Sequence, residues 1–286
     1  MGKLLHEMKI GSLKLRNPYL LAPMLEPNDI AFRLLCKKAG CALTYTGMTS
    51  PLTKKKLSLD DKPALQIFAS SSKGIKSFIK KYDKKVSLWD LNLGCPSTMS
   101  GKLKHGAFMQ DLKTIEKILK VMRKSTKKPI TVKIRKTSIA LDIALLAEKY
   151  VDGVAIHSRT ITQGYSGEPD YDFAIQIKKS VKIPVIYSGN INEKNAQKIL
   201  QDFDFVFVGR EAIGRPEIFS KLNNKNKLSN FSEYFKLAKK YKLPFRQIKY
   251  QAMNFSKGQA DAKKIRAGIA RIKNLEELKK FLIDNK

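Results

Sequence analysis

The sequence predicts an α/β protein, a (β/α)8 TIM barrel followed by a small C-terminal all-helical domain. Short apolar runs rich in β-branched residues recur eight times between residues 19 and 208. Segments of helical periodicity separate most of these runs, and this alternation is typical of βαβ units that build a parallel sheet. Beyond residue 222 the apolar residues follow helical periodicity only.

The eight expected strands are short, and in a barrel they would pair in sequence order. They cover residues 19–22, 42–46, 64–68, 87–93, 130–134, 153–157, 185–188 and 205–208. The expected helices are 29–39, 73–82, 112–125, 138–150, 171–180, 192–201 and 211–222. The gap after the second strand shows no helical pattern. An open doubly wound sheet is the alternative, but no Gly-rich dinucleotide fingerprint follows the first strand.

A polar linker, residues 223–227, separates a predicted barrel domain (1–222) from a predicted helical domain (223–286). Four helices are expected in the second domain, at 231–241, 245–255, 261–272 and 275–283. This segment contains 17 Lys or Arg against 5 Asp or Glu. We interpret it as a basic domain with an electrostatic task, or otherwise as a solvated cap.

Basic residues dominate the whole chain, with 56 Lys and Arg against 25 Asp and Glu and a formal net charge of +31. This excess favours a polyanionic partner, either nucleic acid or a membrane surface; a Lys-rich proteome or high-salt solvation is the alternative. No apolar run reaches the roughly 18 residues of a membrane span, and residues 1–7 lack an apolar signal core. We therefore expect a soluble cytoplasmic protein and predict no protein partner.

Three cysteines are too few and too scattered for a disulfide framework or a paired zinc site, so no metal is expected. Cys36 and Cys41 belong to an apolar helical run and its end, which indicates packing residues. Cys95 is different. It follows a strand that breaks on Gly94 and precedes Pro96, and this places a thiol on a constrained turn at a strand end.

Polar residues recur where the expected strands end, and in a barrel of parallel strands these ends converge. Burying so many polar groups is costly unless a ligand binds them. The residues concerned are Ala22, Pro23 and Met24 (first strand), Gln66 (third), Asn92 and Cys95 (fourth), Lys133 and Arg135 (fifth), His157 and Arg159 (sixth), Asn190 (seventh), and Gly209 and Arg210 (eighth).

The last two strand ends indicate which kind of ligand this is. Asn190, Gly209 and Arg210 lie at the common phosphate site of this barrel, where backbone N–H groups and a guanidinium can bind an anion. A phosphate-bearing cofactor with a polar ring system would use Gln66 and Lys133 at its other end, and a lysine beside a flavin pyrimidine would stabilise negative charge there.

Six motifs in order and spacing resemble those of the tRNA-dihydrouridine synthases. They are Arg-Asn-Pro (16–18) with Ala-Pro-Met (22–24), Asp-Leu-Asn-Leu-Gly-Cys-Pro-Ser (90–97), Val-Lys-Ile-Arg (132–135), His-Ser-Arg-Thr (157–160), Ser-Gly-Asn (188–190) and Val-Gly-Arg (208–210). The resemblance covers residues 1 to about 220, and the tail is more loosely similar to the RNA-binding domain of that family. Departures occur at Thr98-Met99, in the loop 102–107 and at Gly-Asn-Ile (189–191) after the seventh strand.

This resemblance implies an FMN-dependent reduction of the C5–C6 double bond of uridine in tRNA, with NADPH or NADH as the electron donor. Hydride would pass from FMN to C6, and Cys95 would give a proton to C5. The implied cofactor-binding residues are Ala22, Pro23, Met24, Gln66, Lys133, His157, Asn190, Gly209 and Arg210. The implied substrate-binding residues are Asn92, Arg135, Arg159 and, in the tail, Arg246, Lys264 and Arg266. The uridine would have to be turned out of the folded tRNA.

Two other functions fit parts of the pattern. Another FMN barrel oxidoreductase acting on a free pyrimidine, similar to dihydroorotate dehydrogenase, would share the strand ends but would need neither the +31 charge nor the basic tail. A non-catalytic RNA-binding protein would share the charge but would not need Cys95, Lys133 and Gln66 together.

Overall fold

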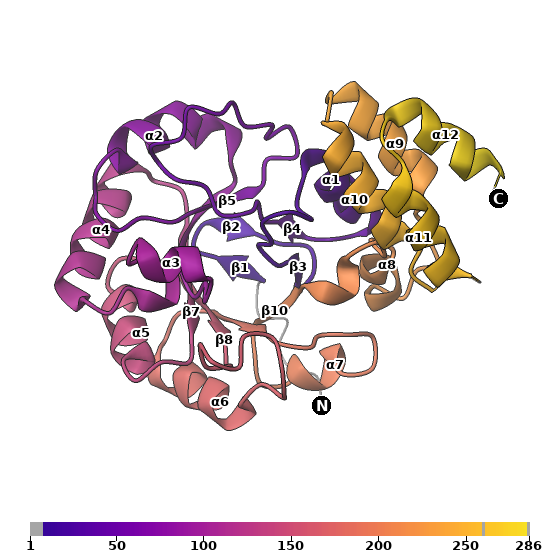
Figure 1. The fold of residues 1–286 in the computed structure, drawn as a ribbon. Helices are drawn as coiled ribbons and strands as arrows, with labels where there is room; N and C mark the ends of the chain where they lie inside the picture. The colour runs from indigo at the N-terminus through magenta and orange to yellow at the C-terminus, as the bar shows by residue number, and fades with distance from the viewer. Residues whose placement is uncertain (1–7, 259–260, 285–286) are drawn as a thin grey trace.

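The computed structural model describes residues 8–258 and 261–284, and an eight-stranded parallel sheet forms its centre (Figure 1). The strands are β3 (Tyr19–Leu21), β4 (Leu43–Thr44), β5 (Ala64–Ile67), β6 (Leu88–Leu93), β7 (Ile130–Arg135), β8 (Gly153–His157), β9 (Val185–Ser188) and β10 (Phe205–Val208). They pair in the order β4-β3-β10-β9-β8-β7-β6-β5. Parallel bridges from Tyr45 to Ala64 and from Thr49 to Ile67 join the two ends of this order. The sheet therefore closes into a barrel, as predicted, and the open doubly wound alternative is wrong.

A short hairpin that the sequence pattern did not predict precedes the barrel. It consists of β1 (Lys9–Ile10) and β2 (Leu13–Lys14), with Gly11 in the turn at φ +54°. Ile10 is fully buried and joins the apolar cluster inside the barrel, close to Gly153 at the start of β8. The hairpin thus covers the end of the barrel where the strands begin. Residues 1–7, where we expected no signal core, lie outside the described residues.

Helices surround the barrel and bury one apolar face each against it (Figure 1). They are α1 (Ile30–Ala39), α2 (Ile75–Tyr82), α4 (Leu112–Ser125), α5 (Ala140–Glu148), α6 (Tyr171–Ser180), α7 (Ala196–Ile199) and α8 (Ile218–Leu222). Shorter pieces are α3 (Thr98–Lys102) and the 3-10 turns η1 (Asp83–Lys85), η2 (Gly106–Phe108) and η3 (Arg210–Ala212). Asp29, Asp111 and Asp170 begin α1, α4 and α6, and each carboxylate accepts a backbone N–H of the first turn.

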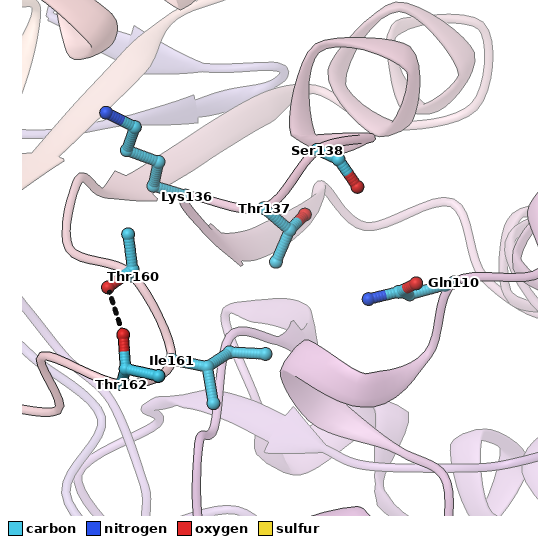
Figure 2. Close-up of a pocket in the computed structure, with 7 residues that line it drawn as sticks. All are labelled: Gln110, Lys136, Thr137, Ser138, Thr160, Ile161 and Thr162. Atoms are coloured by element: carbon cyan, nitrogen blue, oxygen red, sulfur yellow. Dashed lines mark hydrogen bonds between the residues drawn. The ribbon is translucent and has the colours of Figure 1, made fainter.

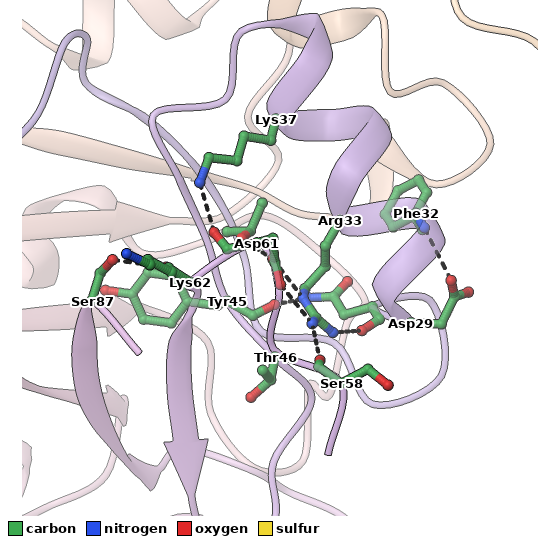
Figure 3. A network of polar contacts seen from close by, with 12 residues as sticks. Asp29, Phe32, Arg33, Lys37, Tyr45, Thr46, Ser58, Asp61, Lys62 and Ser87 are labelled. Carbon is green, nitrogen blue, oxygen red and sulfur yellow. Dashed lines mark hydrogen bonds and ion pairs between the residues drawn. The ribbon is translucent and has the colours of Figure 1, made fainter. Parts of the chain in front are cut away.

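A loop replaces the helix between β4 and β5, as the sequence pattern predicted, and α1 holds it in place (Figure 3). Arg33 reaches from α1 and binds both carboxylate oxygens of Asp61 at 2.9 Å. The same guanidinium donates to the carbonyls of Asn28 and Ser58, while Thr44 donates to Asp61 at 2.6 Å. Both charged side chains are buried, so this ion pair replaces the packing that a helix would supply.

Four further helices follow the barrel and gather beside α1 and α8 (Figure 1). They are α9 (Phe231–Lys240), α10 (Phe245–Phe255), α11 (Ala262–Arg271) and α12 (Leu275–Asp284). Asp29 joins them to the barrel, because its carboxylate accepts from Tyr234 on α9 and from Gln247 and Gln251 on α10. We call helices α9–α12 the tail. Its division from the barrel as a separate domain stays a prediction.

No helix in residues 8–258 or 261–284 combines the length and apolar composition needed to cross a membrane.

Candidate active site

The polar strand ends meet at one end of the barrel, as the parallel topology requires. In the register of β6 and β7, Asn92 pairs with Lys133. Two residues further along β7, Arg135 pairs with His157 of β8, which in turn pairs with Ser188 of β9. Side chains that the sequence separates by many residues therefore form one surface.

Cys95 lies at this end, on a turn held from several directions. The side-chain oxygen of Asn92 accepts from the backbone N–H groups of Gly94 and Cys95 at 3.2 and 3.0 Å. Arg135 donates its Nε to the Gly94 carbonyl at 2.8 Å. Gly106, at φ +62°, packs so closely that a Cβ there would lie 2.7 Å from the Cys95 carbonyl oxygen. The thiol remains partly exposed on a fixed turn.

Cys36 and Cys41, in contrast, are fully buried free thiols, in agreement with their interpretation as packing residues. Burial raises the pKa of Cys36 well above its ordinary value and raises that of Cys41 to about 12. Cys95 is thus the accessible thiol among the three.

Gln66 and Asn92 are joined inside the barrel, and a third residue, Asp90, completes the group. Asn92 donates its Nδ2 to the Gln66 side-chain oxygen at 2.8 Å, and Gln66 donates its Nε2 to Asp90 at 2.7 Å. Asp90 is fully buried and also accepts the Thr131 hydroxyl proton. Desolvation raises the pKa of Asp90 to about 7, although these two hydrogen bonds oppose the shift. No role for Asp90 follows from the sequence pattern, although it is a charge within an apolar strand and the first residue of the 90–97 motif.

Lys133 supplies a positive charge at the open end of the barrel. Its side chain is partly exposed, and it forms no hydrogen bond or ion pair with any other residue that the structure describes. Desolvation, and after it the charge of Arg135, lowers the pKa of Lys133 to about 8. An ammonium group left without a protein partner at this position suits an anionic or carbonyl-bearing ligand.

His157 is a neutral hydrogen-bond donor without an acceptor. Its Nε2 lies 3.2 Å from Arg159 Nη1, and a guanidinium only donates, so the imidazole proton is on Nδ1. That Nδ1 is buried and has no partner among the described residues. Desolvation, followed by the charge of Lys133, lowers the pKa of His157 to about 2.

Arg135 and Arg159 are both buried and use their guanidinium groups on backbone carbonyls. Arg135 donates to Thr160 and Gly164 as well as to Gly94. Arg159 donates to Ser166 and Gly167. Both arginines therefore fix the loop after β8, a task that the sequence pattern did not reveal. Their assignment to substrate binding stays a prediction.

The ends of β9 and β10 are brought together by a hydrogen bond between two predicted phosphate-binding residues. Arg210 Nη2 donates to the Asn190 side-chain oxygen at 2.8 Å. Both side chains are exposed, and Asn190 has the left-handed φ of +49°. Gly209 precedes Arg210, and a Cβ on it would lie 3.6 Å from that of Ala22, just after the neighbouring strand β3. This arrangement leaves the guanidinium accessible to an anion.

The remaining predicted residues lie at the end of β3 and on the tail. Ala22 is buried and its carbonyl accepts from Asn28, whereas Pro23 and Met24 are partly exposed. On α10, Arg246 is 93% exposed, with its guanidinium 3.7 Å from Glu26. On α11, Lys264 is exposed and Arg266 is partly exposed. These three basic residues lie outside the barrel, so any contact with a substrate would be to its outer parts.

A cavity of about 420 Å3 lies on the rim beyond β7 and β8 (Figure 2). It is lined by Gln110, Lys136, Thr137, Ser138, Thr160, Ile161 and Thr162. The Lys136 amine extends away from Gln110 and Ser138 and pairs with Asp170. None of the lining residues is a predicted site residue, so this cavity is adjacent to the candidate active site and not part of it.

Sequence comparison finds a family model and curated relatives that match this chain. The model of the dihydrouridine synthase family matches residues 20–284. The tRNA-dihydrouridine synthase B of Vibrio parahaemolyticus is 31% identical over 241 residues, which cover 76% of this chain and 74% of that protein. The tRNA-dihydrouridine synthase B of Klebsiella pneumoniae is 31% identical over 239 residues, with the same coverage.

Solved structures with the same fold are much more distant in sequence. The old yellow enzyme homologue of Zymomonas mobilis has a TM-score of 0.60 and 10% identity, covering 79% of this chain and 94% of that one. The old yellow enzyme of Trypanosoma cruzi has a TM-score of 0.58 and 11% identity, covering 81% and 95%. These two likenesses show the TIM-barrel fold alone. The match over residues 20–284 and the two curated relatives show that the chain belongs to the dihydrouridine synthase family.

Proposed function

We propose that this protein reduces the C5–C6 double bond of uridine in tRNA to dihydrouridine, using a bound FMN and NADPH or NADH as the electron donor. The observation that carries the proposal is the fixed, partly exposed thiol of Cys95 beside Asn92 at the open end of the barrel. Family membership and the names of the curated relatives support the choice of tRNA as the substrate. We propose the cytoplasm as the place of this activity.

The residues at the strand ends fit an FMN. The unpartnered Nδ1–H of His157 and the ammonium of Lys133, which lies near the charge of Asp90 but forms no hydrogen bond among the described residues, are donors that suit an acceptor-rich ligand. Arg210, accessible at the end of β10, would bind the phosphate together with Asn190 and the Gly209 backbone. Lys133 would hold the pyrimidine edge of the ring, and Ala22, Pro23 and Met24 would pack against it. Gln66 is 1% exposed and bonded to Asp90 and Asn92, so it would offer the ring only its second Nε2 proton. When bound, FMN supplies the hydride chemistry that protein side chains lack.

Cys95 is suited to give a proton to the C5 atom of uracil. A thiol acts as a general acid only while it is protonated, and a fixed turn keeps its proton in one place. One Nδ2 proton of Asn92 is donated to Gln66, which leaves the second for a uracil carbonyl. Arg135 contributes through the 2.8 Å hydrogen bond from its Nε to the Gly94 carbonyl oxygen, which holds the turn in place.

The charge distribution supports a tRNA substrate over a free pyrimidine. The net charge of +31 supplies affinity for a phosphate backbone, and a small ring would gain little from it. Within the tail, two acidic side chains are already paired, Glu233 with Lys38 and Glu276 with Lys279. Each pair balances one glutamate against one lysine and leaves the net positive charge of the tail segment in place.

Flavin reoxidation tests this proposal against its main alternative. The purified protein should be yellow, and after anaerobic reduction by NADPH it should be reoxidised by tRNA that lacks dihydrouridine. Orotate and free uridine should leave the flavin reduced. The Cys95→Ala variant, which should still bind FMN and tRNA, controls for reoxidation by residual oxygen.

Two outcomes would count against the proposal. Rapid reoxidation by orotate without any by tRNA would favour an oxidoreductase of free pyrimidines. A colourless protein that takes up no added FMN would refute both enzyme functions and would leave the RNA-binding alternative.

A further inference from the structure

The interior of the barrel contains a chain of hydrogen bonds that leads from a buried carboxylate to the Cys95 turn. We infer that Asp90 is a positioning residue: it fixes the orientation of the Gln66 and Asn92 side-chain amides and thereby holds the backbone of Cys95. Only the expected effect of Asp90 on turnover rests on the proposed function. The structural part of the inference concerns the thiol and needs no substrate.

Asp90 lies in the middle of β6, between two direct neighbours in the sheet. Gln66 of β5 and Thr131 of β7 are its register partners. All three side chains are 1% exposed or less. Because such a site excludes water, each hydrogen bond of the carboxylate must come from the protein, and the two neighbours supply them.

The order of donors and acceptors follows from the carboxylate. Asp90 accepts from Gln66 with one carboxyl oxygen and from Thr131 with the other, so Gln66 turns its NH2 group towards it. The Gln66 oxygen then faces Asn92 and requires its NH2 group, as the 2.8 Å contact shows. This leaves the Asn92 oxygen for the N–H groups of Gly94 and Cys95. Each amide has a single orientation that satisfies both of its neighbours.

The opposite side of Asp90 provides an internal control. Thr131 gives its proton to Asp90, so its oxygen can accept from the Tyr45 hydroxyl, 3.4 Å away. This branch leads away from the cysteine. A variant of Thr131 therefore removes a hydrogen bond from the same carboxylate without breaking the path to Cys95.

Alkylation of Cys95 by iodoacetamide in the folded full-length protein is the direct readout. Cys36 and Cys41 are fully buried, so the native-state rate reports on Cys95, and peptide mass mapping confirms the site. Asp90→Leu removes the acceptor and keeps the branched shape with the same number of non-hydrogen atoms. It should speed alkylation about fivefold, the population change that the loss of one ordinary hydrogen bond allows. Asp90→Asn, which can still accept from Gln66, should stay within about twofold of the wild type.

Thr131→Val is the matched control and should lower the melting temperature while leaving the alkylation rate unchanged. The inference is overturned if Asp90→Leu lowers stability but alkylates Cys95 at the wild-type rate, because Asp90 would then be structural only. It is also overturned if Thr131→Val and Asp90→Leu accelerate alkylation equally.

A second pair of variants answers the same question if Asp90→Leu fails to fold. Gln66→Glu places a carboxylate opposite the Asp90 carboxylate, so two acceptors face each other. Adding Asp90→Asn supplies an amide NH2 group that can donate to the carboxylate introduced at position 66. At alkaline pH the single variant should alkylate faster than the wild type, and the double variant should return towards the wild-type rate. A double variant that is no slower than the single one would refute the inference.

Turnover separates this inference from the proposed function. With tRNA as substrate, Asp90→Leu should lower kcat with little change in KM, because Asp90 has no exposed surface for tRNA to contact. If the wild-type protein forms no dihydrouridine, the proposed function fails, while the alkylation series still decides whether Asp90 positions the cysteine turn.

Discussion

At the scale of single residues, His157 shows how a site can fix a protonation state by its surroundings. The imidazole is 5% exposed, and both desolvation and four nearby cations oppose its charging. It therefore remains neutral at physiological pH, with its proton on the buried Nδ1. A histidine in this state can donate a hydrogen bond but does not exchange protons during a reaction.

This lowered pKa predicts a pH dependence of stability. The unfolded His157 binds a proton below about pH 6.5, and the folded one does not until about pH 2, so the unfolded state binds more protons in between. The free energy of unfolding should therefore fall as the pH drops below about 6.5, by at most about 1.4 kcal/mol per pH unit from this residue.

Urea denaturation of the wild type and of His157→Gln between neutral and acidic pH measures this contribution. Glutamine keeps an acceptor for Arg159 but does not titrate, so its stability should decline less steeply. Subtracting the two curves cancels the contributions of all other titrating groups to the pH dependence. Asp90 is one of these groups, and its contribution has the opposite sign because its raised pKa makes the folded state bind more protons. Parallel curves would mean that His157 has the same pKa in the folded protein as in the unfolded chain, which would contradict the lowered pKa.

At the scale of elements, α1 depends on the buried ion pair between Arg33 and Asp61 (Figure 3). Arg33→Ala would leave the Asp61 carboxylate buried without its cation. We expect a loss of about 3–5 kcal/mol in the free energy of unfolding, measured by chemical denaturation. Lys38→Ala, on the same helix, breaks only the solvent-exposed pair with Glu233 and should cost less than about 1 kcal/mol. Similar losses in both variants would contradict the role assigned to Arg33.

Gly214 tests how tightly the tail packs on the barrel. It adopts φ +75°, and a Cβ there would lie 2.1 Å from the Asn254 carbonyl oxygen on α10. Gly214→Ala should cost about 3 kcal/mol or more, since overpacking adds to backbone strain. Gly258→Ala, at φ +78° with open space around it, should cost only the strain of about 1–2 kcal/mol. Equal losses by chemical denaturation would show that α10 does not pack against Gly214 in solution.

The comparison of sequence with structure is also clearest for elements and their contacts. Apolar runs such as 130–134 and 205–208 identified all eight barrel strands, because a strand buried on both faces has a continuous apolar sequence. The hairpin at residues 9–14 was missed because two-residue strands are too short for any periodicity.

The convergence of the site residues Asn92, Lys133 and His157 followed from the parallel topology of the barrel. The bonds of Arg135, Arg159 and Asp90 did not, because their partners are backbone carbonyls or interior side chains that no sequence pattern specifies.

At the scale of the whole molecule, the barrel carries the proposed chemistry and the tail adds basic surface next to α1 and α8 (Figure 1). Arg246, Lys264 and Arg266 are the residues proposed to contact tRNA from this surface. Replacing all three by glutamine should weaken tRNA binding at low salt. It should also lower the slope of log affinity against log salt by about 1 for each phosphate that these side chains neutralise in the wild type.

A matched variant separates a local contact from net charge. Lys117, Lys124 and Lys127 are exposed on α4 and just after it, on the side of the barrel away from the tail in Figure 1. Their replacement by glutamine removes the same charge and should change the slope much less. Equal slopes for the two triple variants, measured by filter binding over a range of salt concentrations, would indicate that the tail has no special contact with tRNA.

Mass spectrometry of tRNA tests the central claim most directly. Unmodified tRNA is incubated with the FMN-loaded protein and NADPH, digested to nucleosides and compared with the same reaction using Cys95→Ala. The wild type should convert one or more uridines to dihydrouridine, a gain of two hydrogens, and loss of the general acid should slow this by about 100-fold or more. Unchanged uridine after incubation with the yellow, reducible wild-type protein would contradict the proposed function, and full activity of Cys95→Ala would remove Cys95 as the proton donor.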